Sequence, residues 1–153
     1  MTLFDGHAVI AAPVALPVPI RFSVHGVPKS MRVGGVARFL RAGKMHTVPV
    51  RENSEWALIV GKIARDHAPA KLLDGPVRLT LAFFMPKPKS APKHRRVWPI
   101  TRPDADNLFH KLTDAMNGVL WTDDSVIVEV HLTKDYSPSG FIGLDVTVEQ
   151  LTP

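Results

Sequence analysis

One nine-residue segment, from Val77 to Met85, constrains the possible folds more than any other part of the chain. Its alternate positions are all apolar: Val77, Leu79, Leu81, Phe83 and Met85. Such alternation is typical of a β-strand, because successive side chains of a strand point to opposite faces of the sheet. A face made only of large apolar residues predicts a central strand, around which the other elements must be arranged.

Two segments show the apolar spacing of helices. The first helix is expected to be capped by Asn53 or Ser54 and to end near His67. The second is expected over residues 107–117, with Asp106 as its N-cap. Both carry an apolar stripe that can pack on a sheet.

Three further segments, residues 19–25, 126–132 and 142–148, alternate as half-buried strands do. The unit over residues 77–132 is then strand, helix and strand, for which a right-handed parallel crossover is expected. The last two strands follow each other closely enough to form an antiparallel hairpin. The fold class predicted is α+β, a mixed β-sheet with two main helices.

Residues 26–50 contain basic residues and no acid. Two short strands, residues 37–40 and 45–48, are expected to pair across a turn at residues 41–43. Lys29 and Arg32 stand just before them and are candidates for DNA binding. A basic hairpin suits contact with phosphate, and an ordinary solvated hairpin is an equal alternative.

The length of 153 residues predicts one domain, over residues 19–153, and the proline-broken residues 1–18 are expected to form a flexible arm. Cysteine is absent, which excludes disulfides and thiolate metal sites and fits a reducing compartment. No apolar run reaches the ~18 residues of a membrane span. We therefore expect a cytoplasmic protein that does not bind membranes. Its net charge of +5 favours an anionic partner, nucleic acid first.

Residues 86–103 are too rich in proline and positive charge to pack as a regular element. As a loop beside an active site they would hold a phosphate backbone. The candidate DNA-binding residues here are Lys87, Lys89, Lys93, Arg95, Arg96 and Arg102. Trp98 lies in the same loop, where it either stacks on an unpaired base or packs on the scaffold. Packing is the preferred interpretation, because tryptophan is usually buried.

Residues 102–125 concentrate negative charge and hold five of the chain's fourteen acids: Asp104, Asp106, Asp114, Asp123 and Asp124. Clustered carboxylates repel each other, so a fold keeps them most readily around a cation. The first two are two positions apart, which puts both on one side of an extended segment. The helix that follows is expected to bring Asp123 and Asp124 back towards them. Oxygen ligands without cysteine favour Mg2+, with Mn2+ as an alternative.

A hard cation beside a basic surface indicates phosphodiester hydrolysis. His110 and Lys111, one turn into the helix, can stabilise charge on the phosphate in the transition state. Asp114 is expected to pair with His110, four residues before it. Another interpretation makes Asp106 a cap and the later acids a turn, in a nucleic-acid-binding protein without catalysis. That interpretation leaves unexplained why a DNA binder would place five aspartates beside its basic surface.

The stretch RPDADNLFHKLTDAMNGVLWTDDSVI resembles the signature of the RusA family of Holliday junction resolvases. The shared pattern is Asp-x-Asp-Asn, a lysine in the following helix, Asp-Ala, and Trp-x-Asp-Asp before a strand. The resemblance implies a homodimeric, Mg2+-dependent endonuclease that makes paired nicks in four-way DNA junctions and is commonly encoded by phages and prophages. A less selective endonuclease of branched or flap DNA is the alternative within the nucleases.

By position, the resemblance makes Asp104, Asp106 and Asp124 the metal-binding catalytic carboxylates. Asn107 and Asp123 would support them. The family lysine falls on His110 in this chain, and Lys111 follows it. Either His110 takes the role of that lysine or Lys111 reaches in from about 100° around the helix.

Overall fold

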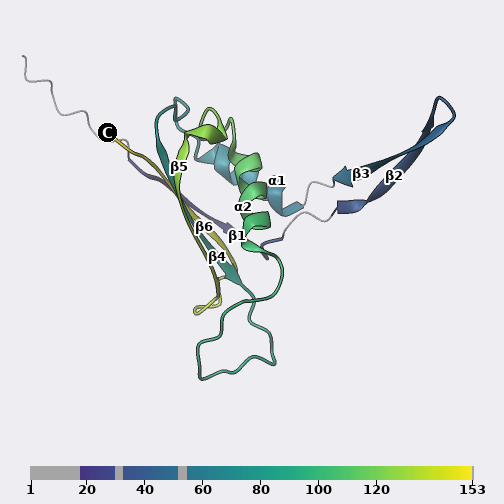
Figure 1. The fold of residues 1–153 in the computed structure, drawn as a ribbon. Coiled ribbons are helices and arrows are strands. Elements are labelled where there is room, and N and C mark those ends of the chain that lie inside the picture. The colour runs from purple at the N-terminus through teal and green to yellow at the C-terminus, as the bar shows by residue number, and fades with distance from the viewer. Residues whose placement is uncertain (1–17, 30–32, 52–54, 153) are drawn as a thin grey trace, which may run out of the picture.

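The computed structural model describes residues 18–29, 33–51 and 55–152. Its main sheet has four strands in the order β1 (Ile20–His25), β6 (Gly143–Gln150), β4 (Val77–Met85) and β5 (Ile127–Tyr136). The helices are α1 (Glu55–Asp66) and α2 (Ala105–Met116), with a short 3-10 turn, η1 (Asp124–Val126), before β5 (Figure 1). This is the α+β fold with a mixed sheet and two helices that the sequence predicts.

Strand β4 is central, as its alternation predicts. It pairs in parallel with β5 and antiparallel with β6, and the chain passes from β4 to β5 through α2. The last two strands do not form the expected hairpin: β6 pairs with β4 and β1 instead, and β5 takes the far side of β4 as an edge strand. The reason is that β4 has two edges, and β5 and β6 each occupy one of them.

The core lies between the sheet and the two helices. One buried cluster joins four side chains of β4 to Trp56 and Val60 of α1 and to Leu108 and Leu112 of α2; those of β4 are Val77, Leu79, Leu81 and Phe83. Burying faces of this size supplies most of the driving force for folding. The other face of β4 is half exposed along its length. The described helices include none long and apolar enough to cross a membrane.

Helix α2 begins at Ala105, so its N-cap is Asp104 and the expectation of Asp106 as cap is wrong. The amide of Leu108 already donates to the carbonyl of Asp104 at 3.1 Å. The entry to the helix is set by a tertiary contact, because Lys134 Nζ on β5 donates to the carbonyl oxygens of Thr101 and Pro103 at 2.9 and 3.0 Å. At the other end, Gly118 follows the helix in the left-handed conformation, with φ 71°.

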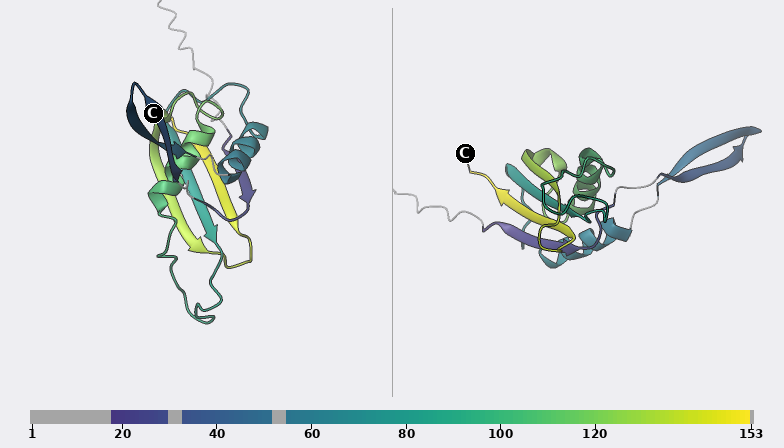
Figure 2. Two further views of the ribbon diagram at one scale, coloured as in Figure 1. Left: turned by 90° about the vertical axis from the view of Figure 1, so that its right-hand side faces the viewer. Right: turned by 90° about the horizontal axis from the view of Figure 1, so that it is seen from below.

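The basic hairpin forms as a separate two-stranded sheet of β2 (Val33–Arg41) and β3 (Lys44–Arg51). Its strands are longer than expected and its turn shorter, with Ala42 and Gly43 both at positive φ (51° and 73°), as two-residue hairpin turns require. The hairpin stands away from the main sheet (Figures 1 and 2). The expected caps at residues 53 and 54 and the N-terminal arm lie outside the described residues.

Candidate functional site

The first acid pair stands at the N-terminal end of α2. Asp104 is the N-cap, in an extended conformation, and its side chain makes no capping hydrogen bond. Asp106 lies in the first helical turn, so the two residues are not on an extended segment as expected. Both carboxylates and the side chain of Asn107 are exposed. The positive end of the helix dipole stabilises negative charge at this position.

The second acid pair precedes β5 and is held by local hydrogen bonds. The indole Nε1 of the fully buried Trp121 donates to Asp124 Oδ1 at 2.8 Å, which fixes this half-buried carboxylate against the core. Asp123 caps η1 by accepting from the backbone amide of Ser125 at 2.9 Å. Hydrogen bonds from the side chain and the amide of Ser125 hold the pKa of Asp123 below its usual value.

The two acid pairs lie at opposite ends of α2. The helix has twelve residues, so it rises by ~18 Å between them. Lys134, near the end of β5, contacts the residue before Asp104, whereas Asp124 precedes the start of β5. The expectation that the second pair approaches the first is therefore wrong within one chain. A helix that connects two parallel strands must travel the length of the sheet, so its two ends are far apart.

Carboxylate oxygens suit a hard cation chemically, but one chain does not assemble a site from them. Within residues 18–29, 33–51 and 55–152, no three histidine, aspartate or glutamate side chains are close enough together to hold a metal ion. The assignment of Asp104, Asp106 and Asp124 as metal ligands stays a prediction.

His110 and Lys111 point to different surroundings. Lys111 is largely buried and pairs with Asp114 at 3.7 Å, so the expected pairing of Asp114 with His110 is wrong. Lys111 and Asp114 line a depression of about 180 Å³ between α1 and α2, where Gly61 lets the helices approach. His110 is exposed, with its ring edge-on to Phe109 at 5.7 Å. Of the two, His110 is the more exposed to solvent.

The basic loop, residues 86–103, extends beyond the end of the sheet between β4 and α2 (Figure 1). All six candidate cations of the loop are exposed, as a phosphate surface requires: Lys87, Lys89, Lys93, Arg95, Arg96 and Arg102. Arg96 differs, because its guanidinium forms an ion pair with Asp135 of β5. Outside the loop, Lys29 is also exposed, whereas Arg32 lies outside the described residues.

Trp98 is 58% exposed, so the interpretation that it packs on the scaffold is wrong. The guanidinium of Arg96 lies over its ring, 4.0 Å from the ring centroid, in a cation–π contact. Pro99, the next residue, is the buried one of this segment. The loop is therefore anchored to the scaffold by the proline, and the tryptophan beside it is left facing solvent.

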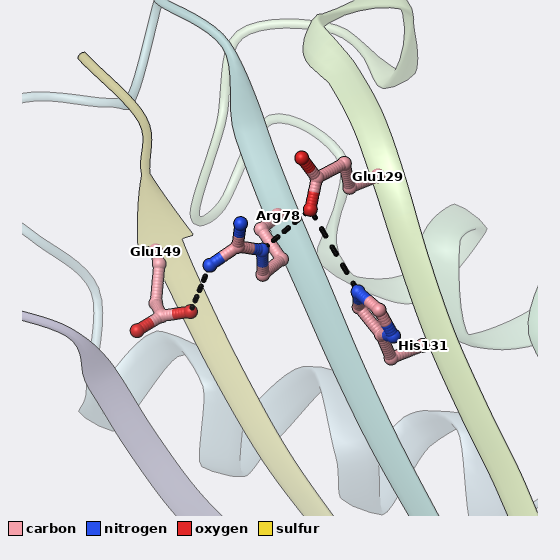
Figure 3. A network of polar contacts seen from close by, with 4 residues as sticks. All are labelled: Arg78, Glu129, His131 and Glu149. Atoms are coloured by element: carbon pink, nitrogen blue, oxygen red, sulfur yellow. Dashed lines mark hydrogen bonds and ion pairs between the residues drawn. The ribbon is translucent and has the colours of Figure 1, made fainter.

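The exposed face of the main sheet carries a charge network that the sequence did not predict (Figure 3). Arg78 Nε donates to Glu129 Oε2 at 2.6 Å, and its Nη1 lies 3.6 Å from Glu149 Oε2. His131 Nε2 lies 3.7 Å from the same oxygen of Glu129. The hydrogen bond with Arg78 lowers the pKa of Glu129 and raises that of Arg78. The network thus places two glutamates around one arginine. The signal in the sequence that could have predicted this network is Arg78, a charged residue on the half-exposed face of β4.

Comparison with known proteins adds two findings. The family model described as endodeoxyribonuclease RusA matches residues 32–149, a span that includes α1, α2, the basic loop and both acid pairs. A protein of Bacillus subtilis (strain 168), "Uncharacterized protein YqaN", is 29% identical to this chain over 127 residues. That alignment covers 77% of this chain and 88% of the Bacillus protein.

Proposed function

Because the chain belongs to the RusA family of endodeoxyribonucleases, we propose that it resolves four-way DNA junctions as a homodimer that needs a divalent cation. Membership makes it a hydrolytic nuclease, and the junction as preferred substrate follows from the family. The observation that carries the proposal is the placement of carboxylates at the two ends of a core helix, with a loop of exposed cations and no acid leading into its N-terminal end.

The loop supplies the part of the site that holds DNA. The exposed cations on this segment can each neutralise a phosphate and release a counterion. The acids at the start of α2 follow this segment directly, so a strand of DNA held along the loop would pass Asp104 and Asp106. His110 is exposed and lies one turn after Asp106 in α2, so it is a better candidate than Lys111 to contact a phosphate. Lys111 is the weaker candidate because it already pairs with Asp114.

The cation, Mg2+ or Mn2+, requires more carboxylates than either end of α2 offers in one chain. We propose that Asp104 and Asp106 of one copy and Asp124 of a second copy hold it together. A bound divalent ion supplies an activated water and offsets charge on the phosphate. Two such composite sites in a symmetric dimer would give one nick on each of two strands. In this arrangement Asp123 holds Asp124 in place, because it caps the short turn η1 in which Asp124 lies.

The direct test is Asp124→Asn on a synthetic four-way junction with Mg2+. The amide can still accept from Trp121, so the fold and DNA binding should be kept while nicking is lost. Asp66→Asn is the matched control: the same change at an exposed acid at the end of α1, outside both acid pairs, which should leave nicking at the parental rate. Parental cleavage by Asp124→Asn would exclude that residue from the site. Flap and duplex substrates in parallel show whether the enzyme selects junctions.

A further inference from the structure

The basic loop is attached to β5 at two places. The first is the ion pair of Arg96 with Asp135, and the second is the pair of hydrogen bonds from Lys134 to the carbonyls of Thr101 and Pro103. Lys134 and Asp135 are adjacent on β5, so their side chains point to opposite faces of the sheet, and the loop is attached on both faces near the end of this strand. The short arc between them, residues 97–100, is therefore held at both ends.

This arc presents two large apolar side chains to solvent. Trp98 is 58% exposed and Ile100 is 91% exposed, whereas Pro99 between them is buried. The other two tryptophans of the chain, Trp56 and Trp121, are 5% and 0% exposed. Exposure of this much apolar surface is unfavourable in water, so its persistence on a fixed arc indicates contact with a partner.

The Trp98 ring is oriented as well as exposed. The guanidinium of Arg96 covers one ring face at 4.0 Å, and Asp135 holds that guanidinium in turn. With more than half of the side chain exposed, the opposite ring face is open to solvent. A flat apolar ring backed by a cation, on a loop without acids, is complementary to a nucleotide, whose base has a flat π face and whose phosphate is negative.

We propose that Trp98 is a stacking platform for an unpaired base of branched DNA, with Ile100 beside it and with Arg96 and Asp135 as the positioning residues. The proposal rests on the proposed function for its choice of DNA as partner. It goes further by naming the feature of the DNA that is recognised. This feature is an unpaired base, as found at the centre of an open junction or in a single strand. Duplex DNA offers no such base along its length, so the platform discriminates by structure.

Intrinsic fluorescence reports on this site, because Trp98 is the exposed one of the chain's three tryptophans. The full chain is titrated in EDTA, so that cleavage does not occur, with a thymine oligonucleotide, a four-way junction and a plain duplex. We expect quenching by the first two and little by the duplex. Trp98→Phe should remove the signal but keep affinity within about twofold, and Trp98→Ala should lower affinity for the junction by roughly tenfold.

Equal affinity of Trp98→Ala and the parent for the junction would overturn the proposal. So would an equal loss on junction and duplex, since a base stack acts only where a base is unpaired. Cleavage in Mg2+ is scored separately. If Trp98→Ala lowers junction affinity but the parent does not nick junctions, the stacking platform is supported and the proposed function is wrong. If the parent nicks junctions but Trp98→Ala binds them as the parent does, the proposed function is supported and the platform is wrong.

The positioning role of Asp135 can be tested, because its loss of charge and its loss of the ion pair with Arg96 change the affinity for junctions in opposite directions. Asp135→Ala removes a negative charge, which by itself strengthens DNA binding. If the ion pair between Asp135 and Arg96 orients Trp98, the same variant weakens junction binding and reduces the quenching. Asp145→Ala is the matched control, an exposed acid of the same sheet face that accepts from Ser23, and its junction affinity should stay equal or rise. Tighter junction binding by Asp135→Ala would overturn the positioning role of Asp135.

Discussion

A composite cation site predicts that two inactive variants restore each other. Asp106→Asn removes a carboxylate from the N-terminal end of α2, and Asp124→Asn removes one from the other end. Each variant alone loses one essential ligand from both sites of a symmetric dimer. In a mixed dimer, one site collects both substitutions and the other collects neither.

The structure sets the magnitude. The two ends of α2 are separated by ~18 Å along the helix axis, whereas Mg2+ holds its oxygen ligands at about 2.1 Å. A rotation of side chains does not close that gap, so one chain alone cannot supply both ends. An isolated mixed dimer should then nick junctions at about half the parental rate, since one of two equivalent sites is intact. It should give single nicks and no paired cuts.

The assay needs two tags on co-expressed variants, tandem purification of the mixed dimer, and a junction labelled on each of two opposed strands. The matched control is the mixed dimer of Asp104→Asn and Asp106→Asn. Both substitutions lie at the same end of α2, so neither site is intact and no activity returns. An inactive dimer of Asp106→Asn with Asp124→Asn that still binds junctions would refute the composite site. Failure to isolate any mixed dimer would refute the dimer.

Three further predictions concern the loop, the helix and the sheet. The double variant Lys93→Ala and Arg95→Ala should flatten the salt dependence of DNA binding by roughly 0.9 in log–log slope for each phosphate that the loop no longer neutralises; an unchanged slope would show that the loop does not touch DNA. At saturating DNA, His110→Ala should lower the single-turnover nicking rate and Lys111→Ala should not; the opposite result would assign the role to the lysine. Glu129 has a lowered pKa in the folded state, chiefly through its hydrogen bond from Arg78, so its stabilisation is present above the ordinary value of 4.5 and is lost as pH falls through the lowered value. The unfolding free energy of the parent should therefore drop more on acidification than that of Glu129→Gln, measured by urea denaturation at several pH values, and parallel pH profiles would contradict this.

Local patterns were sufficient for the elements themselves. Alternation defined β4 to the residue, because a central strand needs one continuous apolar face. The family was also readable from a single stretch, since its acids and tryptophan keep a fixed order along the chain. Each of these signals depends on neighbours in sequence, which is why the sequence alone determined them.

The arrangement of the site depended on contacts between distant segments. The crossover from β4 to β5 placed Asp104 and Asp124 at opposite ends of α2, although their closeness in sequence suggested one cluster. Asp135, far along the chain, took Arg96 out of the set of free cations, and Trp98 beside it stayed exposed. Spacing along a chain reports which residues are near in sequence, whereas distances across a sheet follow from strand order and direction, and these only the tertiary structure decided.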